Sequence, residues 1–141
     1  MRSRLAIQLD PNAMTQVRRM VAAFVAENRL EADEQSRILI VLEELVTNAM
    51  KYGYPSRSQP GAAEIALELE DARLTIEYID DGDAFDPFSQ PPPDFEGPLE
   101  ERSLGGLGIH IVRSLAEDAR YRRINDRNVI QLTRRVIRAD R

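Results

Sequence analysis

Apolar and polar residues alternate on both sides of a short charged turn in the middle of the chain. Side chains of a β-strand point alternately to its two faces, so two such runs joined by a turn predict an antiparallel hairpin. One face of this hairpin is apolar and needs a covering layer of other elements. The apolar positions are Ile65, Leu67 and Leu69 before residues 70–73, and Leu74, Ile76 and Tyr78 after them.

Helical spacing of apolar residues elsewhere in the chain predicts that covering layer. A first helix is expected to follow Asp10 as its N-cap, with Pro11 at its first position, and to run to about Asn28. A second helix is expected to end at Gly53, because glycine is common just beyond helix ends. The second and third predicted helices cover residues 33–52 and 107–119.

The remaining strands are predicted at residues 4–9, 121–124 and 129–133, the last two as a hairpin around residues 125–128. This order of elements predicts an α+β fold, a two-layer sandwich. Its mostly antiparallel, mixed sheet would be covered on one face by about three helices. Strict strand-helix alternation and the sequence G-x-x-x-x-G-K-[ST] are both absent, which excludes a Rossmann or P-loop nucleotide domain.

Length and composition favour one domain covering residues 1–141, since 43% hydrophobic residues in 141 suffice for a single core. The absence of cysteine excludes disulfides and thiolate metal sites, and a lone histidine, His110, argues against a histidine-built zinc site. A net charge of −5 disfavours direct nucleic-acid binding. No apolar run approaches about 20 residues, so we expect no membrane span and a cytoplasmic location.

Glu44 and Asn48 are polar residues four positions apart in the second predicted helix, and they therefore share one face of it. A carboxylate that accepts a proton, next to an amide oxygen that binds a hard cation, suits chemistry on a nucleotide phosphate. Two alternatives stay open at this point. The pair could lie on a solvated face, or Asn48 could belong to a fraying last turn.

Asp80 ends the apolar strand of the central hairpin and is followed by an acidic turn that contains Gly82. Its carboxylate can accept a hydrogen bond from an exocyclic amine such as that of adenine, while Gly82 lets the backbone approach a flat ring. The plain alternative is an ordinary Asp-Gly turn that opens a loop. Calcium is not favoured, because the spacing of an EF-hand loop is absent.

A glycine-rich segment, residues 103–112, is predicted to be a turn that runs into the third helix. Glycines leave their backbone N–H groups accessible, and together with a helix N-terminus such groups suit a polyphosphate. The glycines here are Gly105, Gly106 and Gly108. Glycine-rich turns before helices are also common without a ligand. His110 is expected to be a structural or surface residue of this helix. The long proline-rich stretch before it predicts a flexible lid over residues 86–106 or so.

Together these three segments resemble the N box and the two glycine boxes of the GHKL ATPases, the superfamily that includes gyrase and the histidine kinases. The matching residues are Glu44-x-x-x-Asn48-Ala49, Asp80-x-Gly82 and Gly105-Gly106-Leu107-Gly108. Within that superfamily, Gly82-x-x-Phe85-Asp86-Pro87 and the compact length resemble the anti-sigma factor serine/threonine kinases. The resemblance covers residues 5–135 and implies the Bergerat, histidine-kinase-like ATPase fold.

The resemblance implies an ATP site with Mg²⁺. Asn48 would bind the Mg²⁺ that bridges the phosphates, Asp80 would bind the adenine amine, and Glu44 would be the general base. The chain departs from the family at Ala84, where many relatives have glycine, and at Arg127-Asn128, where relatives often have Gly-Thr. The remaining nucleotide-binding positions implied are Lys51, Gly82, Gly105, Gly106, Leu107 and Gly108.

The function that the resemblance implies is that of an anti-sigma factor with ATP-dependent serine/threonine kinase activity. Such a protein phosphorylates an anti-anti-sigma protein and sequesters a sigma factor, and a homodimer is compatible with the resemblance. The alternative is a non-catalytic, ATP-gated protein-binding switch. A histidine-kinase core is a third and weaker alternative, because His110 lies inside the glycine-rich segment and the chain has no room for a dimerisation hairpin.

Overall fold

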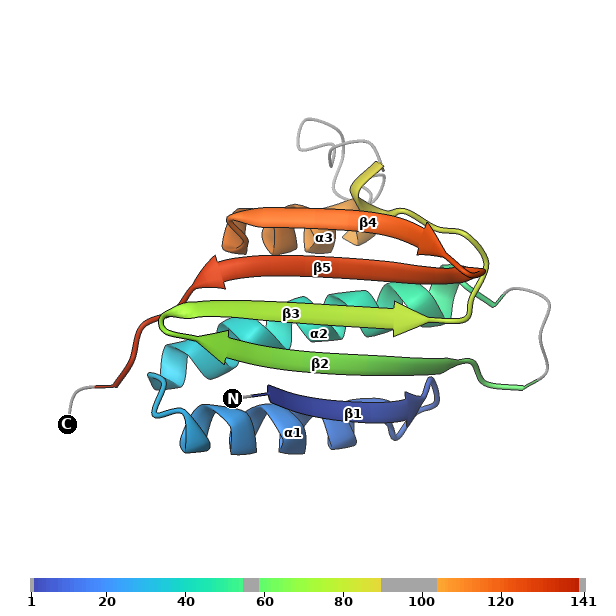
Figure 1. Ribbon diagram of the computed structural model, residues 1–141. Helices are drawn as coiled ribbons and strands as arrows, with labels where there is room; N and C mark the ends of the chain where they lie inside the picture. Colours follow the sequence, from blue (N-terminus) through green and yellow to red (C-terminus); the bar gives the residue numbers. More distant parts are fainter. Residues whose placement is uncertain (1, 55–58, 90–103, 140–141) are drawn as a thin grey trace.

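The computed structural model describes residues 2–54, 59–89 and 104–139, with only the backbone of residues 104–107. A five-stranded sheet forms one layer and three α-helices form the other, all on the same side of the sheet (Figure 1). The elements in chain order are β1 (Arg2–Gln8), α1 (Ala13–Glu27), α2 (Ala32–Tyr52), β2 (Ala62–Glu70), β3 (Arg73–Asp80), the 3₁₀ turn η1 (Pro87–Ser89), α3 (Leu104–Leu115), β4 (Asp118–Ile124) and β5 (Arg127–Arg135).

The sheet has the strand order β1-β2-β3-β5-β4, and each pairing among the described strands is antiparallel. The α+β sandwich is therefore confirmed, while the expectation that the sheet is mixed is wrong. The reason is that β5 returns from the β4 edge and inserts beside β3, which separates β3 from β4. Two-residue turns with positive φ at Asp71, Asn125 and Asp126 close the two predicted hairpins.

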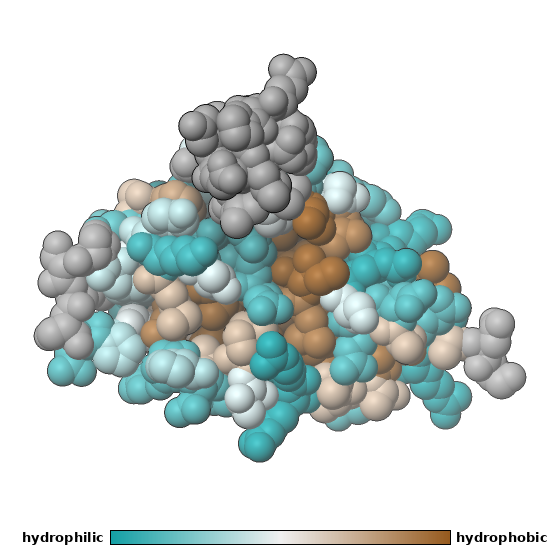
Figure 2. All heavy atoms as spheres, turned by 180° about the vertical axis from the view of Figure 1, so that it is seen from behind, coloured by the Kyte–Doolittle hydropathy of each residue, from teal (hydrophilic) through white to brown (hydrophobic). Residues whose placement is uncertain are grey.

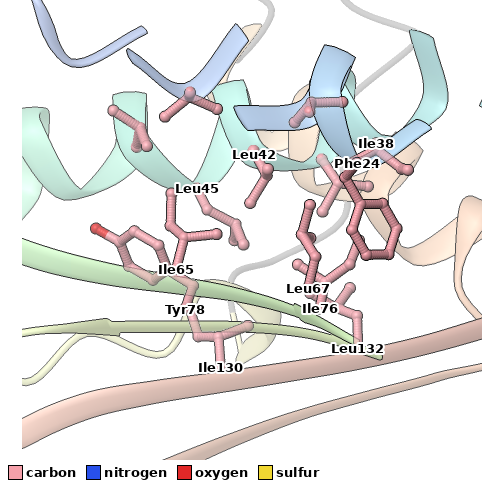
Figure 3. Close-up of a cluster of buried hydrophobic side chains, with 14 of the residues drawn as sticks. Phe24, Ile38, Leu42, Leu45, Ile65, Leu67, Ile76, Tyr78, Ile130 and Leu132 are labelled. Carbon is pink, nitrogen blue, oxygen red and sulfur yellow. The ribbon is translucent and has the colours of Figure 1, made fainter. Parts of the chain in front are cut away.

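The core lies between the helices and the inward face of the sheet (Figure 3). The apolar side chains on both sides of residues 70–73 face inward as predicted, and the apolar face of α2 packs against them. Tyr78 lies at one end of this cluster. The largest fully buried apolar side chains are Phe24, Ile38, Leu42, Leu45, Ile65, Leu67, Leu74, Ile76, Tyr78 and Leu132.

Three predicted helix boundaries are wrong. The first helix begins at Ala13 instead of Pro11, because the Asp10 carboxylate accepts a hydrogen bond from Asn12 N–H and closes a turn before the helix. The third helix begins at Leu104 and ends at Leu115, so Ala119 belongs to β4. The second helix ends next to Gly53 as predicted, and Gly53 N–H donates to the Ala49 carbonyl.

The outer surface of the helical layer carries a group of apolar side chains among polar ones (Figure 2). Ile40 of α2 and Ile111 of α3 are exposed apolar residues of that layer. No helix in the described ranges is long and apolar enough to cross a bilayer. Residues 90–103, which make up most of the predicted lid, lie outside the described residues.

A buried carboxylate ties the start of α2 to the end of the chain. Glu34 is 0% exposed, and its side chain accepts hydrogen bonds from Arg134 Nη2 at 2.8 and 3.1 Å and from Ile137 N–H at 3.3 Å. Arg37, one turn along α2, donates to the same carboxylate. This network fixes Arg134 and Ile137 against the beginning of α2.

Replacing Glu34 with alanine should lower the free energy of unfolding by about 3 kcal/mol, because it leaves the nearly buried Arg134 guanidinium without its counter-charge. Chemical denaturation at neutral pH measures the loss. Glu27→Ala is the matched control at an exposed helical position, and it should change stability by less than about 0.5 kcal/mol. Equal losses in the two variants would contradict a stabilising network at Glu34.

Candidate functional site

The second helix brings Glu44 and Asn48 to the edge of the core. Its apolar stripe faces the sheet, which leaves these two residues on the flank of the helix, next to α3. Asn48 is buried and donates a hydrogen bond from Nδ2 to Glu44 Oε1 at 3.2 Å. Glu44 is half-buried, whereas Glu43 is exposed. The solvated-face alternative therefore fails for Asn48, while Glu44 is partly exposed.

The environment of Glu44 favours its protonated form. Burial raises the pKa of Glu44 above its ordinary value, while the hydrogen bond from Asn48 and the positive charge of Lys51 act in the opposite direction. Lys51 itself is exposed in the last turn of α2. Its side chain thus influences Glu44 through its charge, without lying in the buried part of the site.

Glycine at position 108 allows α3 to pack closely against the Glu44 carboxylate. A Cβ atom on Gly108 would overlap the carboxylate carbon and both oxygens of Glu44. Gly105, Gly106 and Leu107 lie in the first turns of the same helix, so the predicted glycine-rich turn is wrong at these positions. A side chain at position 108 would therefore have to displace the end of the Glu44 side chain.

Asp80 lies at the end of β3 with a buried side chain. Gly82 N–H donates to Asp80 Oδ1 at 3.0 Å, which turns the chain sharply after the strand. A Cβ atom on Gly82 would lie 3.0 Å from the Gly53 carbonyl oxygen, and the next residue, Asp83, donates its N–H to that oxygen at 2.9 Å. The segment after β3 is therefore docked on the end of α2.

Asn128, at the start of β5, holds Asp80 in place from the neighbouring strand. Asn128 Nδ2 donates to Asp80 Oδ1 at 2.8 Å and to the Asp83 carbonyl oxygen at 2.8 Å. Both amide protons of this buried side chain are therefore used. The long amide side chain of Asn128 therefore reaches Asp80 directly.

The oxygen of the Asn128 amide is occupied as well. Asn128 Oδ1 accepts hydrogen bonds from Tyr121 OH at 2.6 Å, from Arg123 Nη1 at 3.1 Å and from Phe85 N–H at 3.2 Å. Arg123 also donates to the Gly82 carbonyl oxygen at 2.8 Å. One side chain thus links β3, β4, β5 and the loop after Asp80, and sequence reasoning had marked it only as a departure from the family.

These residues surround one pocket between the end of α2 and the sheet. Asn48 and Asp80 both line it, so the structure brings together two of the predicted site residues, whereas Glu44 lies beside it. Tyr78 was missed, although strand alternation places it on the same face as Asp80. The lining residues are Leu45, Asn48, Ala49, Gly53, Tyr78, Asp80, Phe85, Pro87, Asn128 and Ile130.

The donor set fits a magnesium ion that is shared with phosphates better than an ion held by protein alone. Within the described ranges no group of three or more Asp, Glu, His or Cys residues could hold a metal. The amide orientation that gives Nδ2 to Glu44 leaves Asn48 Oδ1 for another partner. An amide oxygen completed by phosphate oxygens and water is a common environment for Mg²⁺.

Comparison with known families agrees with this geometry. Residues 7–134 match the family described as "Histidine kinase-like ATPase domain". The chain belongs to this family. Membership of an ATPase family implies that the domain binds ATP, and the GHKL resemblance of its sequence is confirmed. The pocket lined by Asn48 and Asp80 is the described cavity that contains residues from both the first and the second sequence box.

Curated relatives of the domain carry kinase and anti-sigma names. It is 31% identical over 85 residues to the "Serine-protein kinase RsbW" of Staphylococcus epidermidis, covering 56% of this chain and 52% of that protein. It is 31% identical over 99 residues to the "Anti-sigma F factor" of Clostridium botulinum, covering 69% and 67%. The chain thus spans about half the length of the RsbW proteins that it matches.

Solved structures support the fold. The RsbU and RsbW domains of a Mycobacterium tuberculosis protein match with a TM-score of 0.68 at 19% identity, over 100% of this chain and 33% of that one. The histidine kinase domain of a blue-light activated kinase from Erythrobacter litoralis matches with a TM-score of 0.54 at 18% identity, over 92% and 62%. The histidine-kinase-like ATPase fold is therefore confirmed.

Replacing Asn128 with alanine should lower the free energy of unfolding by about 2–3 kcal/mol, because the Asp80 carboxylate and the Tyr121 hydroxyl lose a buried partner. Thermal and urea denaturation provide the measurement. Asn12→Ala is the control, since Asn12 is exposed and makes no side-chain cap. A loss as small as that of the control would show that the Asn128 hydrogen bonds contribute nothing to stability.

The pH dependence of stability should reveal the raised pKa of Glu44. A carboxyl group whose folded pKa exceeds its unfolded value of 4.5 stabilises the protein below that pH, and the contribution is lost as the pH rises through the folded pKa. Glu44→Gln has no titrating carboxyl group at this position and so lacks this pH-dependent contribution to stability. From pH 4 to pH 8 the variant should therefore gain stability relative to wild type, as measured by urea denaturation at each pH.

Glu43→Gln, at the exposed neighbouring position, serves as the control and should follow the wild-type profile. A constant difference between wild type and Glu44→Gln across this pH range would contradict the raised pKa.

Proposed function

We propose that this protein is an ATP-dependent serine/threonine protein kinase that acts as an anti-sigma factor. The observation that carries the proposal is the position of Glu44, a half-buried carboxylate with a raised pKa that is hydrogen-bonded to Asn48 beside the pocket. The names of the RsbW and anti-sigma F relatives support the same activity. A sigma factor acts in the cytoplasm, which is accordingly the proposed location.

The nucleotide would lie in the pocket between the end of α2 and the sheet. Asp80 would accept a hydrogen bond from the adenine amine, and Gly82 would let the backbone approach the base. The phosphates would extend toward α3, where Gly105 and Gly106 lie in the first turn and would offer backbone N–H groups, followed by Leu107 and Gly108. Lys51 carries a positive charge at the same end of α2.

Asn48 would hold Mg²⁺ through its side-chain oxygen, together with the ATP phosphates. The bound ion would supply positive charge to the phosphate oxygens during transfer. This role fits the observed orientation of Asn48, whose Nδ2 is committed to Glu44. The protein therefore contributes one neutral oxygen ligand and leaves the negative charges to the nucleotide.

Glu44 would act as the general base for a serine or threonine hydroxyl on the partner protein. The hydroxyl oxygen bonds to the γ-phosphorus as the bond to the bridging oxygen breaks, and ADP leaves. Glu44 accepts the hydroxyl proton, for which a carboxylate made more basic by burial is suited. Asn48 holds Glu44 by its hydrogen bond and so fixes the base next to the phosphates.

The proposed protein partners are an anti-anti-sigma protein, which is the phosphorylation substrate, and a sigma factor, which is sequestered. The apolar residues exposed on the helical layer are available to such partners (Figure 2). A homodimer is also proposed on the family resemblance. The second candidate function is an ATP-gated binding switch without turnover, which the close packing of Gly108 on Glu44 favours.

Glu44→Ala separates the two functions. If Glu44 is the general base, the variant should transfer γ-phosphate to the anti-anti-sigma protein at least about 100-fold more slowly than wild type while it still binds ATP. The measurement uses radiolabelled ATP, Mg²⁺ and the cognate anti-anti-sigma protein. Glu43→Ala, one position away and exposed, should retain wild-type activity.

Wild-type protein that binds ATP tightly but transfers no phosphate would favour the switch. Capture of partners from the native cell with and without ATP then tests the second half of the proposal. Recovery of a sigma factor supports anti-sigma activity. Recovery of unrelated proteins alone would overturn it.

A further inference from the structure

Tyr78 carries a buried hydroxyl group that makes no hydrogen bond to any part of the chain that the structure describes. The residue is 1% exposed and points inward from β3, two positions before Asp80. Figure 3 shows its ring among the apolar core residues, with the hydroxyl oxygen at the edge of the cluster. Tyr78 and Asp80 line the same pocket.

A buried hydroxyl without a partner costs free energy in the folded protein, because it has lost its hydrogen bonds to water. Phenylalanine at position 78 would fill the same core space without that cost. The unpaired group at the wall of a pocket therefore points to a ligand that supplies the missing partner.

Most of the polar atoms next to Tyr78 in the pocket wall are already used within the protein. Asn128 uses both of its amide protons and its oxygen in hydrogen bonds within the protein. Asp80 Oδ1 accepts from Gly82 N–H and from Asn128 Nδ2. The Tyr78 hydroxyl lies next to the Asp80 carboxylate and interacts with it electrostatically. A ligand thus meets one carboxylate oxygen and one phenol side by side.

The Tyr78 hydroxyl stays protonated at neutral pH. Burial, and then the negative charge of Asp80, raise the pKa of Tyr78 well above its usual value. The group can therefore donate a proton to a ligand acceptor, while Asp80 can only accept. The wall offers an acceptor and a donor next to each other.

We propose that Tyr78 reads the purine base, donating its hydroxyl proton to the ring nitrogen adjacent to the exocyclic amine that Asp80 binds. This inference rests on the proposed binding of ATP in this pocket. Adenine presents an amine next to an acceptor nitrogen, which matches the wall. Guanine presents a carbonyl next to an N–H, which would place oxygen against the Asp80 carboxylate. Tyr78 is thus a specificity-determining residue for adenine.

Cytosine shares the pattern of an amine next to a ring acceptor, so the shape of the pocket has to separate the two bases. A two-ring base would bury more surface than a one-ring base against the apolar side chains of Leu45, Ala49 and Ile130. CTP is therefore included in the binding measurements, and we expect wild type to bind CTP more weakly than ATP.

Tyr78→Phe removes the hydroxyl and keeps the ring. The variant should bind ATP about tenfold more weakly than wild type in titration calorimetry, which corresponds to the loss of one hydrogen bond. Its thermal midpoint without nucleotide should equal or exceed that of wild type, because an unpaired buried group is gone. Tyr52→Phe is the control, since Tyr52 is exposed and keeps its stacking on Phe85.

An ATP analogue in which the ring nitrogen next to the amine is replaced by CH identifies the contact without relying on the variant. Wild type should bind this 1-deaza analogue about tenfold more weakly than ATP, and Tyr78→Phe should bind both equally. Wild type should also bind ATP more tightly than GTP. The ratio of the two affinities should be smaller in Tyr78→Phe.

Several outcomes would overturn the inference. Equal ATP affinity of wild type and Tyr78→Phe would show that the hydroxyl contacts no base, while the proposed kinase function would stand. If Tyr78→Phe lowered the affinities for ATP and for the 1-deaza analogue by the same factor, Tyr78 would act only through Asp80. Wild type that binds no ATP at all would refute the proposed function itself, and the inference with it.

Discussion

The packing of α2 on the inward face of the sheet is the contact on which the rest of the structure depends. Leu42 and Leu45 of the helix are buried against the strands, which fixes the rotation of the helix about its axis. That rotation sets where the polar residues of α2 lie. Asn48 reaches the pocket and Glu44 faces α3 because the apolar stripe leaves them no other direction.

A second constraint is the satisfaction of buried polar groups at the end of β3. Asp80 is buried at a strand end, where a carboxylate is costly without hydrogen bonds. Asn128 and the Gly82 N–H supply them, and Arg123 and Tyr121 support Asn128 in turn. The network holds Asp80 Oδ1 in a fixed position. A pocket wall fixed in this way would need little reorganisation to bind the base that we propose for it.

Local periodicity explains how much of the fold could be predicted. The central hairpin, the second helix and the last hairpin were correct because each is specified by residues close together in the chain. The start of α3 was wrong because glycines usually interrupt helices. The packing of α3 against α2, which brings Gly108 next to Glu44, joins residues far apart in sequence and is not visible in local patterns.

The sequence by itself determined the order and type of the elements, the shared helix face of Glu44 and Asn48, and the place of Asp80 at a strand end. The tertiary structure alone decided that Asn128, 48 residues after Asp80, donates to its carboxylate and that Tyr78 presents an unpaired hydroxyl beside it. The physical reason is that hydrogen-bond partners in a sheet depend on which strands become neighbours. The insertion of β5 beside β3 set those neighbours.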